Sequence, residues 1–128
     1  MERVTGIGGI FFKARDPKAL AAWYAQHLGV EVLDWGGAVF RWGEGTDAAA
    51  GSTVWSPFAA DTKYFAPSEA SFMLNYRVRD LDAMLAQLRA AGAQVDEKTM
   101  DDDALGRFGW AMDPEGNRFE LWQPPEGK

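Results

Sequence analysis

The sequence has no cysteine and only one histidine among its 128 residues. Without cysteine, the chain can form no disulfide bond, no thiolate metal site and no cysteine nucleophile. The histidine, His27, falls at the expected end of a helix, with no serine or paired carboxylate in its motif. We therefore expect a structural role for His27 at the helix dipole, and we exclude a Ser-His-Asp triad, which would need the same residue.

Long apolar runs and clusters of basic residues are also missing. The apolar stretches are too short to cross a membrane, and the N-terminus, Met1-Glu2-Arg3-Val4, does not resemble a signal peptide. A formal net charge of −6 argues against nucleic acid or an anionic membrane as a partner, because binding phosphate groups requires clustered Lys and Arg. We accordingly expect a cytoplasmic protein with no nucleic-acid or membrane partner, folded as a single domain over residues 1–128.

What the sequence does contain is an internal repeat. An apolar segment is followed by Asp16-Pro17 and a helical stretch that ends at Gly29, and the same order recurs with Asp80 and Gly92. Asp is a good helix N-cap, and Gly adopts the left-handed conformation that ends helices. The repeat predicts two half-modules, at about residues 4–57 and 70–124, and paired halves commonly enclose a cleft that holds the functional site.

Apolar spacing and turn residues place the secondary structure within each half. The segment 57–68 is expected to be an irregular crossover, and Asp101–Asp103 a solvated acidic loop. The predicted fold class is α+β, with two βαβββ modules that form a curved, open, eight-stranded, barrel-like sheet. The expected helices cover residues 17–28 and 81–91, and the expected strands cover residues 4–14, 30–33, 38–42, 52–55, 71–78, 94–98, 108–112 and 118–122.

Two motifs resemble the vicinal oxygen chelate superfamily, which includes glyoxalase I, extradiol dioxygenases and bleomycin resistance proteins. The first is Asp-Pro followed by a helix that carries Trp-Tyr and ends in His-Leu-Gly. The second is Asp113-Pro114-Glu115-Gly116-Asn117-Arg118-Phe119-Glu120-Leu121. The resemblance extends from about Val4 to Pro124. It implies paired βαβββ modules, and it leads us to expect a homodimer.

The resemblance also implies where a metal ion would be held in the metal-dependent members. The corresponding positions in this chain are Gly9 and Met73 on the first strand of each half, approximately Thr53, and Glu120. Only Glu120 matches. Gly9 has no side chain, the thioether of Met73 is a poor ligand for hard or borderline divalent ions, and catalytic metal sites normally use three protein ligands. The sequence therefore predicts no cofactor and no divalent metal.

Glu120 is the candidate for polar or catalytic work in the cleft. Strand alternation would place it on one face with Arg118 and Trp122. The alternative is a structural ion pair with Arg118, Arg41 or Arg77. The candidate ligand-binding residues, chosen by strand alternation and by the geometry that the resemblance implies, are Phe11, Trp55, Met73, Asn75, Trp110 and Glu120.

Three functions remain open at this stage. The first is a metal-independent protein of the bleomycin-resistance type, which holds a partly apolar small molecule in an aromatic cleft. The second is a metal-dependent lyase or dioxygenase resembling glyoxalase I, with Glu120 as metal ligand or base. The third is an interaction module without a ligand, whose cleft would be filled by its own side chains.

Overall fold

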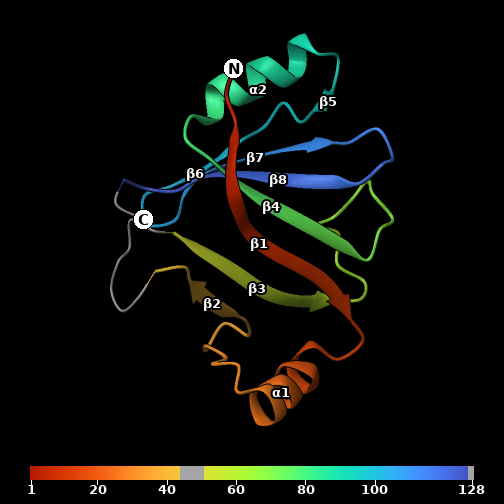
Figure 1. Ribbon diagram of the computed structural model, residues 1–128. Helices are drawn as coiled ribbons and strands as arrows, with labels where there is room; N and C mark the ends of the chain where they lie inside the picture. The colour runs from red at the N-terminus through yellow and green to blue at the C-terminus, as the bar shows by residue number, and fades with distance from the viewer. Residues whose placement is uncertain (44–50, 127–128) are drawn as a thin grey trace.

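The computed structural model describes residues 1–43 and 51–126, which form two helices and an eight-stranded mixed sheet (Figure 1). The helices are α1 (Pro17–Leu28) and α2 (Leu81–Ala90), and the strands are β1 (Val4–Ala14), β2 (Ala38–Arg41), β3 (Ser52–Ala59), β4 (Phe72–Val78), β5 (Gln94–Val95), β6 (Met100–Asp102), β7 (Gly106–Met112) and β8 (Arg118–Gln123).

Both helices begin where the repeated Asp residues predict. Oδ1 of Asp16 accepts a hydrogen bond of 3.0 Å from the backbone N–H of Ala19, and Oδ1 of Asp80 accepts one of 3.1 Å from that of Ala83. Such caps satisfy N–H groups that have no partner within the helix. Gly29 ends α1 with a φ of 69°, which a residue with a Cβ adopts only at a cost.

The two halves of the repeat pair within one chain. The strand order is β2-β3-β1-β4-β8-β7-β5, with β6 paired to β7. In each half the first strand lies parallel to the last, β1 to β3 and β4 to β8, and the halves meet where β1 runs antiparallel to β4. The predicted fold class is therefore confirmed.

One face of the sheet carries the helices. Ring centroids of Trp55 in β3 and Tyr24 in α1 lie 5.1 Å apart, so Trp55 faces α1. On the second half, α2 buries a row of leucine and methionine side chains against the same face, each contributing about 1.5–3 kcal/mol of burial free energy. The buried core of this packing consists of Val78, Leu81, Met84, Leu85 and Leu121.

The opposite face, called the inner face below, carries the candidate residues. Phe11 lies opposite Met73 in the β1–β4 ladder, and Asn75 lies beside Glu120 in the β4–β8 ladder. Trp110 of β7 lies opposite Glu120. Residues paired across neighbouring strands point to the same side of a sheet, so all five share the inner face.

Several predicted boundaries are wrong. Residues 30–33 form no strand; instead the N–H groups of Leu33 and Gly36 bond to the carbonyls of Gly37 and Leu33 in a turn. Two residues of the acidic segment expected to be a loop, Asp101 and Asp102, belong to β6 because they pair with the start of β7, while Asp103 follows in a turn. β3 extends to Ala59, past the predicted end at residue 55, because its parallel ladder with β1 continues.

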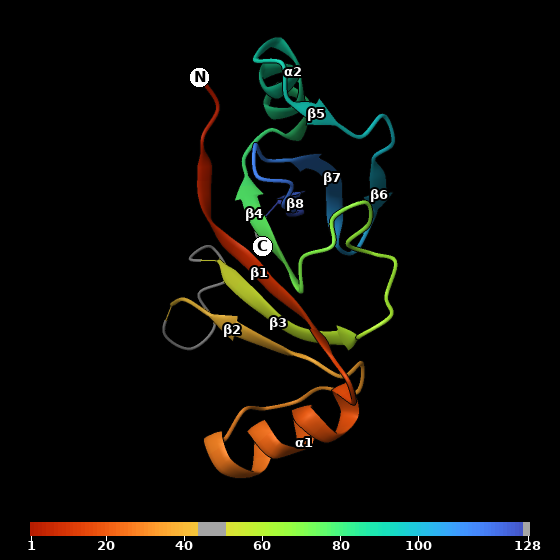
Figure 2. The ribbon, with the colours of Figure 1, turned by 90° about the vertical axis from the view of Figure 1, so that its right-hand side faces the viewer.

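The connection between β3 and β4 crosses the inner face. In Figure 2 it leaves β3 in yellow-green, rises beside β6 and β7, and returns to the start of β4. Its residue Phe65 is 0% exposed and packs with Phe11, Met73 and Trp110. The segment predicted to be irregular therefore supplies part of the core.

Neither helix of the described residues is long and apolar enough to cross a membrane.

Candidate functional site

Glu120 stands at the centre of the inner face and is 2% exposed. Its Oε1 accepts a hydrogen bond of 2.6 Å from Nδ2 of Asn75. Its Oε2 accepts one of 2.8 Å from Nε1 of Trp110 and a second from the hydroxyl of Tyr64. Three neutral donors from β4, β7 and the β3–β4 connection thus surround one carboxyl group.

Burial has the largest effect on the pKa of the Glu120 carboxyl group. It raises the pKa of Glu120 above its ordinary value near 4.5, although the three hydrogen bonds and the charge of Arg118 act in the opposite direction. Burial and the neighbouring carboxyl group also raise the pKa of Tyr64, so the phenol keeps its proton and donates it in the hydrogen bond.

Arg118 shares the inner face with Glu120 but pairs with another acid. Its Nη1 lies 2.8 Å from Oδ2 of Asp96, and its Nε donates to the backbone carbonyl of Tyr64 at 3.3 Å. The guanidinium also lies 5.3 Å from the ring centroid of Trp110. Arg118 therefore holds the connection that carries Tyr64. Among the described residues, Glu120 forms no ion pair with Arg118, Arg41 or Arg77.

The inner face has a filled end on the Oε2 side of Glu120. Phe11, Phe65, Met73 and Trp110 form a buried cluster there. The rings of Tyr64 and Phe65 meet edge to face at 6.5 Å, and Tyr64 meets Trp110 at 6.3 Å in the same manner. All four side chains of the cluster are buried by these contacts.

On the Oε1 side, the inner face opens into a cavity of about 400 Å³. The rings of Phe108 and Trp122 lie nearly parallel along its wall, with centroids 6.2 Å apart. Trp35 and Leu105 are 53% and 55% exposed and lie at its mouth, while Asn75 and Glu120 are each 2% exposed and form its floor. The lining residues are Gly8, Phe11, Trp35, Val39, Val54, Asn75, Leu105, Phe108, Glu120 and Trp122.

The floor of the cavity contains an acceptor that the protein leaves unused. Oδ1 of Asn75 is buried and has no hydrogen-bond partner within residues 1–43 and 51–126. It points towards Gly8, where a Cβ atom would collide with it and would lie 2.8 Å from Cε3 of Trp122. The absence of a side chain at Gly8 therefore lets the amide oxygen pack directly against the backbone of β1 at the cavity lining.

Five of the six predicted ligand-binding residues lie together on the inner face: Phe11, Met73, Asn75, Trp110 and Glu120. Three of them, Phe11, Asn75 and Glu120, line the cavity, while Met73 and Trp110 belong to the filled end. The prediction for Trp55 is wrong. Parallel pairing sets Trp55 opposite Ile10, one residue out of phase with Phe11, so Trp55 packs against Phe12 and α1.

The metal-ligand positions implied by the sequence resemblance do not form a metal site. In the β1–β3 ladder Ser56 pairs with Phe11, as Glu120 pairs with Asn75, so the counterpart of Glu120 is Ser56 and not Thr53. The hydroxyl of Thr53 bonds instead to the indole of Trp42 and the carbonyl of Ile7.

The donor set around Glu120 does not fit a divalent ion. Its neighbours present an amide N–H, an indole N–H and a phenol O–H, and none of these is a metal ligand in that state. Among the described residues, no three or more His, Asp or Glu side chains are grouped so that they could hold a metal ion.

Tyr64 and Phe65 contribute to the inner face around Glu120, but they were not predicted from the sequence. They lie in a segment without helical or strand periodicity, so pattern arguments gave no orientation for them. Two adjacent aromatic residues inside a connection otherwise rich in Ala, Asp and Pro were the available signal, because exposed loops seldom need large aromatic side chains.

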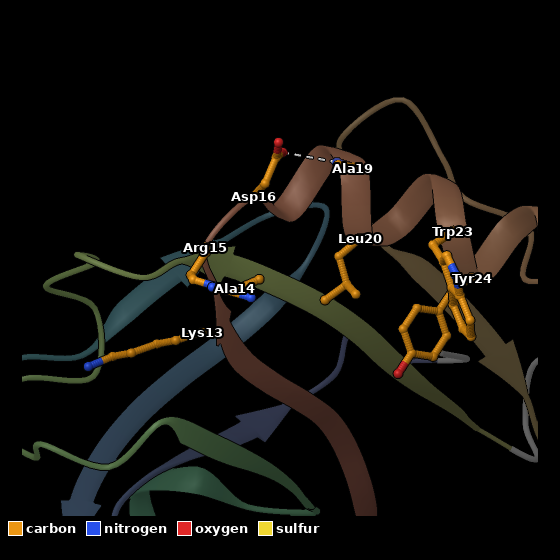
Figure 3. A pocket seen from close by; sticks show the side chains of 8 residues that line it. All are labelled: Lys13, Ala14, Arg15, Asp16, Ala19, Leu20, Trp23 and Tyr24. Atoms are coloured by element: carbon orange, nitrogen blue, oxygen red, sulfur yellow. Dashed lines mark hydrogen bonds between the residues drawn. The ribbon is translucent and has the colours of Figure 1, made fainter.

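A larger hollow of about 880 Å³ lies beside the start of α1 (Figure 3). It is an open groove between the end of β1 and one side of the helix, with Lys13, Arg15 and Asp16 near one end and Trp23 and Tyr24 near the other. Asp16 is already used as the helix cap, and the groove contains no unpartnered buried polar atom within the described chain. The cavity on the inner face is therefore the better candidate site.

Two halves, each with a strand, a helix and further strands, joined in one eight-stranded mixed sheet, match the fold of the vicinal oxygen chelate superfamily. The family model described as "Glyoxalase-like domain" matches residues 9–122, and the chain belongs to this family. No curated protein sequence matches the chain.

Solved structures agree on the fold. Methylmalonyl-CoA epimerase from Mycobacterium tuberculosis has a TM-score of 0.64 and 24% identity, over 95% of this chain and 89% of that one. A methylmalonyl-CoA epimerase in complex with methylmalonyl-CoA and NH4+ has a TM-score of 0.69 and 18% identity, over 98% of this chain and 99% of that one. A catechol 2,3-dioxygenase gives 0.64 at 22% identity, over 96% of this chain but 41% of that one. At these identities the similarity shows the fold alone.

Proposed function

We propose that this protein binds a small, planar, partly apolar molecule in the inner-face cavity, without a metal or other cofactor. The observation that carries the proposal is the cavity itself: aromatic walls lead to a buried amide oxygen that no described residue bonds. Ligand sites are typically apolar clefts of roughly 300–1,000 Å³ with a few placed polar groups, and this cavity fits that description.

The surroundings of Glu120 favour ligand binding without a metal over metal-dependent catalysis. Both carboxyl oxygens already accept hydrogen bonds from the protein, and the other positions where the resemblance implies metal ligands hold a glycine, a methionine and a serine. A metal-dependent lyase or dioxygenase of the glyoxalase type would have to displace these hydrogen bonds and recruit every other ligand from outside the described site.

The proposal is tested by closing the cavity. EDTA-treated protein is titrated with a panel of one- and two-ring aromatic compounds, and binding is followed by intrinsic tryptophan fluorescence and by thermal unfolding. Val54→Trp places extra bulk on the cavity wall and should abolish binding. Ile10→Trp adds similar bulk to the other face of the sheet and is the matched control. Equal binding by both variants would overturn the proposal.

A second candidate is a metal-independent acid–base enzyme. The raised pKa of Glu120, a residue that lines the cavity, favours it, because catalytic carboxyl groups often have pKa values shifted towards neutrality. Some structural neighbours are epimerases. Incubating each bound compound with the protein in D₂O and following C–H exchange by NMR tests this candidate, with Glu120→Gln as the inactive control.

An interaction module without a ligand is the weakest of the three candidates. It requires a cleft filled by its own side chains, and only the end around Phe65 is filled in this way. The remaining volume of about 400 Å³ is unexplained by that function.

A further inference from the structure

The chemistry of the cavity floor restricts the class of ligand, given the proposed function above. Asn75 presents two different atoms. Its Nδ2 donates to Glu120, whose carboxyl group also accepts from Tyr64 and Trp110, and its Oδ1 turns the other way, towards Gly8, which also lines the cavity.

An acceptor left unpaired in a buried site costs free energy of about 1–3 kcal/mol. At Asn75 no described residue relieves the cost. Gly8 supplies no side chain, Trp122 uses its indole N–H on the carbonyl of Leu105, and the Arg77 atom nearest to this place is the apolar Cγ. A ligand that donates a hydrogen bond to Oδ1 would recover this free energy.

The charge around the cavity disfavours anions. No Lys, Arg or His is among the lining residues, and the one ionisable lining group is the carboxyl of Glu120. Arg77 lies 4.9 Å from the ring of Trp122 and 5.3 Å from that of Trp42, and neither Arg77 nor Arg118 lines the cavity itself. Burying an anion without a paired cation is costly, whereas aromatic faces and a carboxyl group favour a cation.

The walls and the volume favour a flat ring system. Phe108 and Trp122 present nearly parallel rings, and Phe11 and Trp35 contribute further aromatic surface. At ~30 Å³ for each water, the cavity corresponds to about 13 water volumes, which is enough for a bicyclic molecule with a short substituent.

We propose that the ligand is an uncharged or cationic aromatic molecule with an N–H or O–H group at its buried edge, and that Oδ1 of Asn75 accepts this hydrogen bond. This assignment rests on the proposed function, and it differs from a site for a metal-chelating anion. Asn75 is then the residue that determines specificity, and the absence of a side chain at Gly8 is what allows Oδ1 to lie at the cavity lining.

Two matched pairs of probes test the two parts of the assignment. Indole and benzofuran have nearly the same shape, but only indole carries a ring N–H. Tryptamine and indole-3-acetate share the indole ring and carry opposite charges. Dissociation constants are measured on EDTA-treated protein by calorimetry. We expect indole to bind at least about tenfold tighter than benzofuran, which is the effect of one buried hydrogen bond. Tryptamine should bind tighter than indole-3-acetate.

Variants connect the preference to Asn75. Asn75→Leu keeps the branched shape of the side chain and removes the acceptor, together with the Nδ2 donor to Glu120, so the ratio between indole and benzofuran should fall to about one. Gly8→Ala keeps Asn75 but adds a Cβ atom that collides with Oδ1, which forces the amide oxygen out of its place, and it should have the same effect if Asn75→Leu does not fold. Phe108→Leu is the control: it should weaken all four probes while leaving the ratio unchanged.

Each outcome separates the two proposals. If aromatic probes bind wild type but not Val54→Trp, and indole and benzofuran bind equally, the donor assignment is overturned while the proposed function stands. Tighter binding of indole-3-acetate than of tryptamine overturns the charge assignment in the same way. If no probe binds, or Val54→Trp binds them all, the proposed function fails and this assignment fails with it.

Discussion

The two ends of the inner face are built from the same residue types and behave differently. Around Phe65 the aromatic side chains interlock and exclude solvent, while around Trp122 similar rings border an empty volume. The division runs through Glu120, whose Oε2 bonds to the filled end and whose Oε1 bonds to Asn75 at the open end. Aromatic content alone therefore does not identify a binding site; what distinguishes the ends is the segment that fills one of them.

The largest expected effect follows from breaking the filled end. Phe65→Ala should lower the free energy of unfolding by about 3–5 kcal/mol, because Phe65 is fully buried and the space cannot collapse easily. Phe108→Ala removes a ring of the same size from the wall of the open end and should cost only about 1–2 kcal/mol. Urea denaturation of both variants measures the difference. Equal losses would show that the ends are equally packed.

Removing the dividing carboxyl group should have the next largest effect. Glu120→Leu leaves the donors of Tyr64, Asn75 and Trp110 buried without an acceptor, and it should cost about 2–4 kcal/mol. Glu120→Gln keeps an acceptor oxygen and should be less harmful. Urea denaturation at one pH compares the two; a Leu variant as stable as wild type would mean that the hydrogen bonds contribute nothing net.

The dependence on pH tests the same group in another way. Because the pKa of Glu120 is raised in the folded state, its contribution to stability is full below the ordinary value near 4.5 and is lost as the pH rises through the raised value. The stability advantage of wild type over Glu120→Gln should therefore shrink with increasing pH above about 4.5. Denaturation of both proteins over a pH series measures this. An advantage that grows with pH would mean that the hydrogen bonds outweigh burial.

Two tryptophans give a finer comparison of the ends. Each donates one indole N–H: Trp110 to the buried carboxyl of Glu120 at 2.8 Å, and Trp122 to the exposed carbonyl of Leu105 at 2.7 Å. Trp110→Phe should cost about 1–2 kcal/mol, and Trp122→Phe less than about 1 kcal/mol, because water can replace only the second bond. The reverse order in thermal or urea unfolding would contradict the division drawn at Glu120.

The sequence was sufficient for the fold and for most of the inner face. The two Asp caps and strand alternation placed Phe11, Asn75 and Glu120 together. Alternate residues of a strand point to the same face, so one correctly assigned residue fixes the face of all the others. The same rule explains the error at Trp55. Aligning the Trp of β3 with Trp122 set the register three residues off, with Thr53 in place of Ser56, and an odd shift moves every side chain to the opposite face.

The filled end could not be predicted from the sequence. Tyr64 and Phe65 act through a connection whose path depends on Arg118 and on packing against β7, and neither leaves a periodic pattern. The empty volume is equally invisible in a sequence, because it depends on which side chains fail to reach one another. The division into a filled and an open end could therefore come only from the structure.

The smallest expected effect is the change in melting temperature on adding divalent metal ions. It tests whether Glu120 only bonds to the two ends of the inner face or can also bind an ion. A specific ion at about 100 times its dissociation constant adds ~2.7 kcal/mol of stability. We expect Mg²⁺, Mn²⁺, Co²⁺, Ni²⁺ and Zn²⁺ to leave the melting temperature of EDTA-treated protein unchanged, and Glu120→Gln to respond identically. The reason is chemical: both oxygens of the carboxyl group already accept hydrogen bonds from N–H and O–H donors, and the residue at the same ladder position in the first half is Ser56. Stabilisation that disappears in Glu120→Gln would mean that an ion can displace Tyr64 from Oε2, and the filled end would then be a closed state of a metal site.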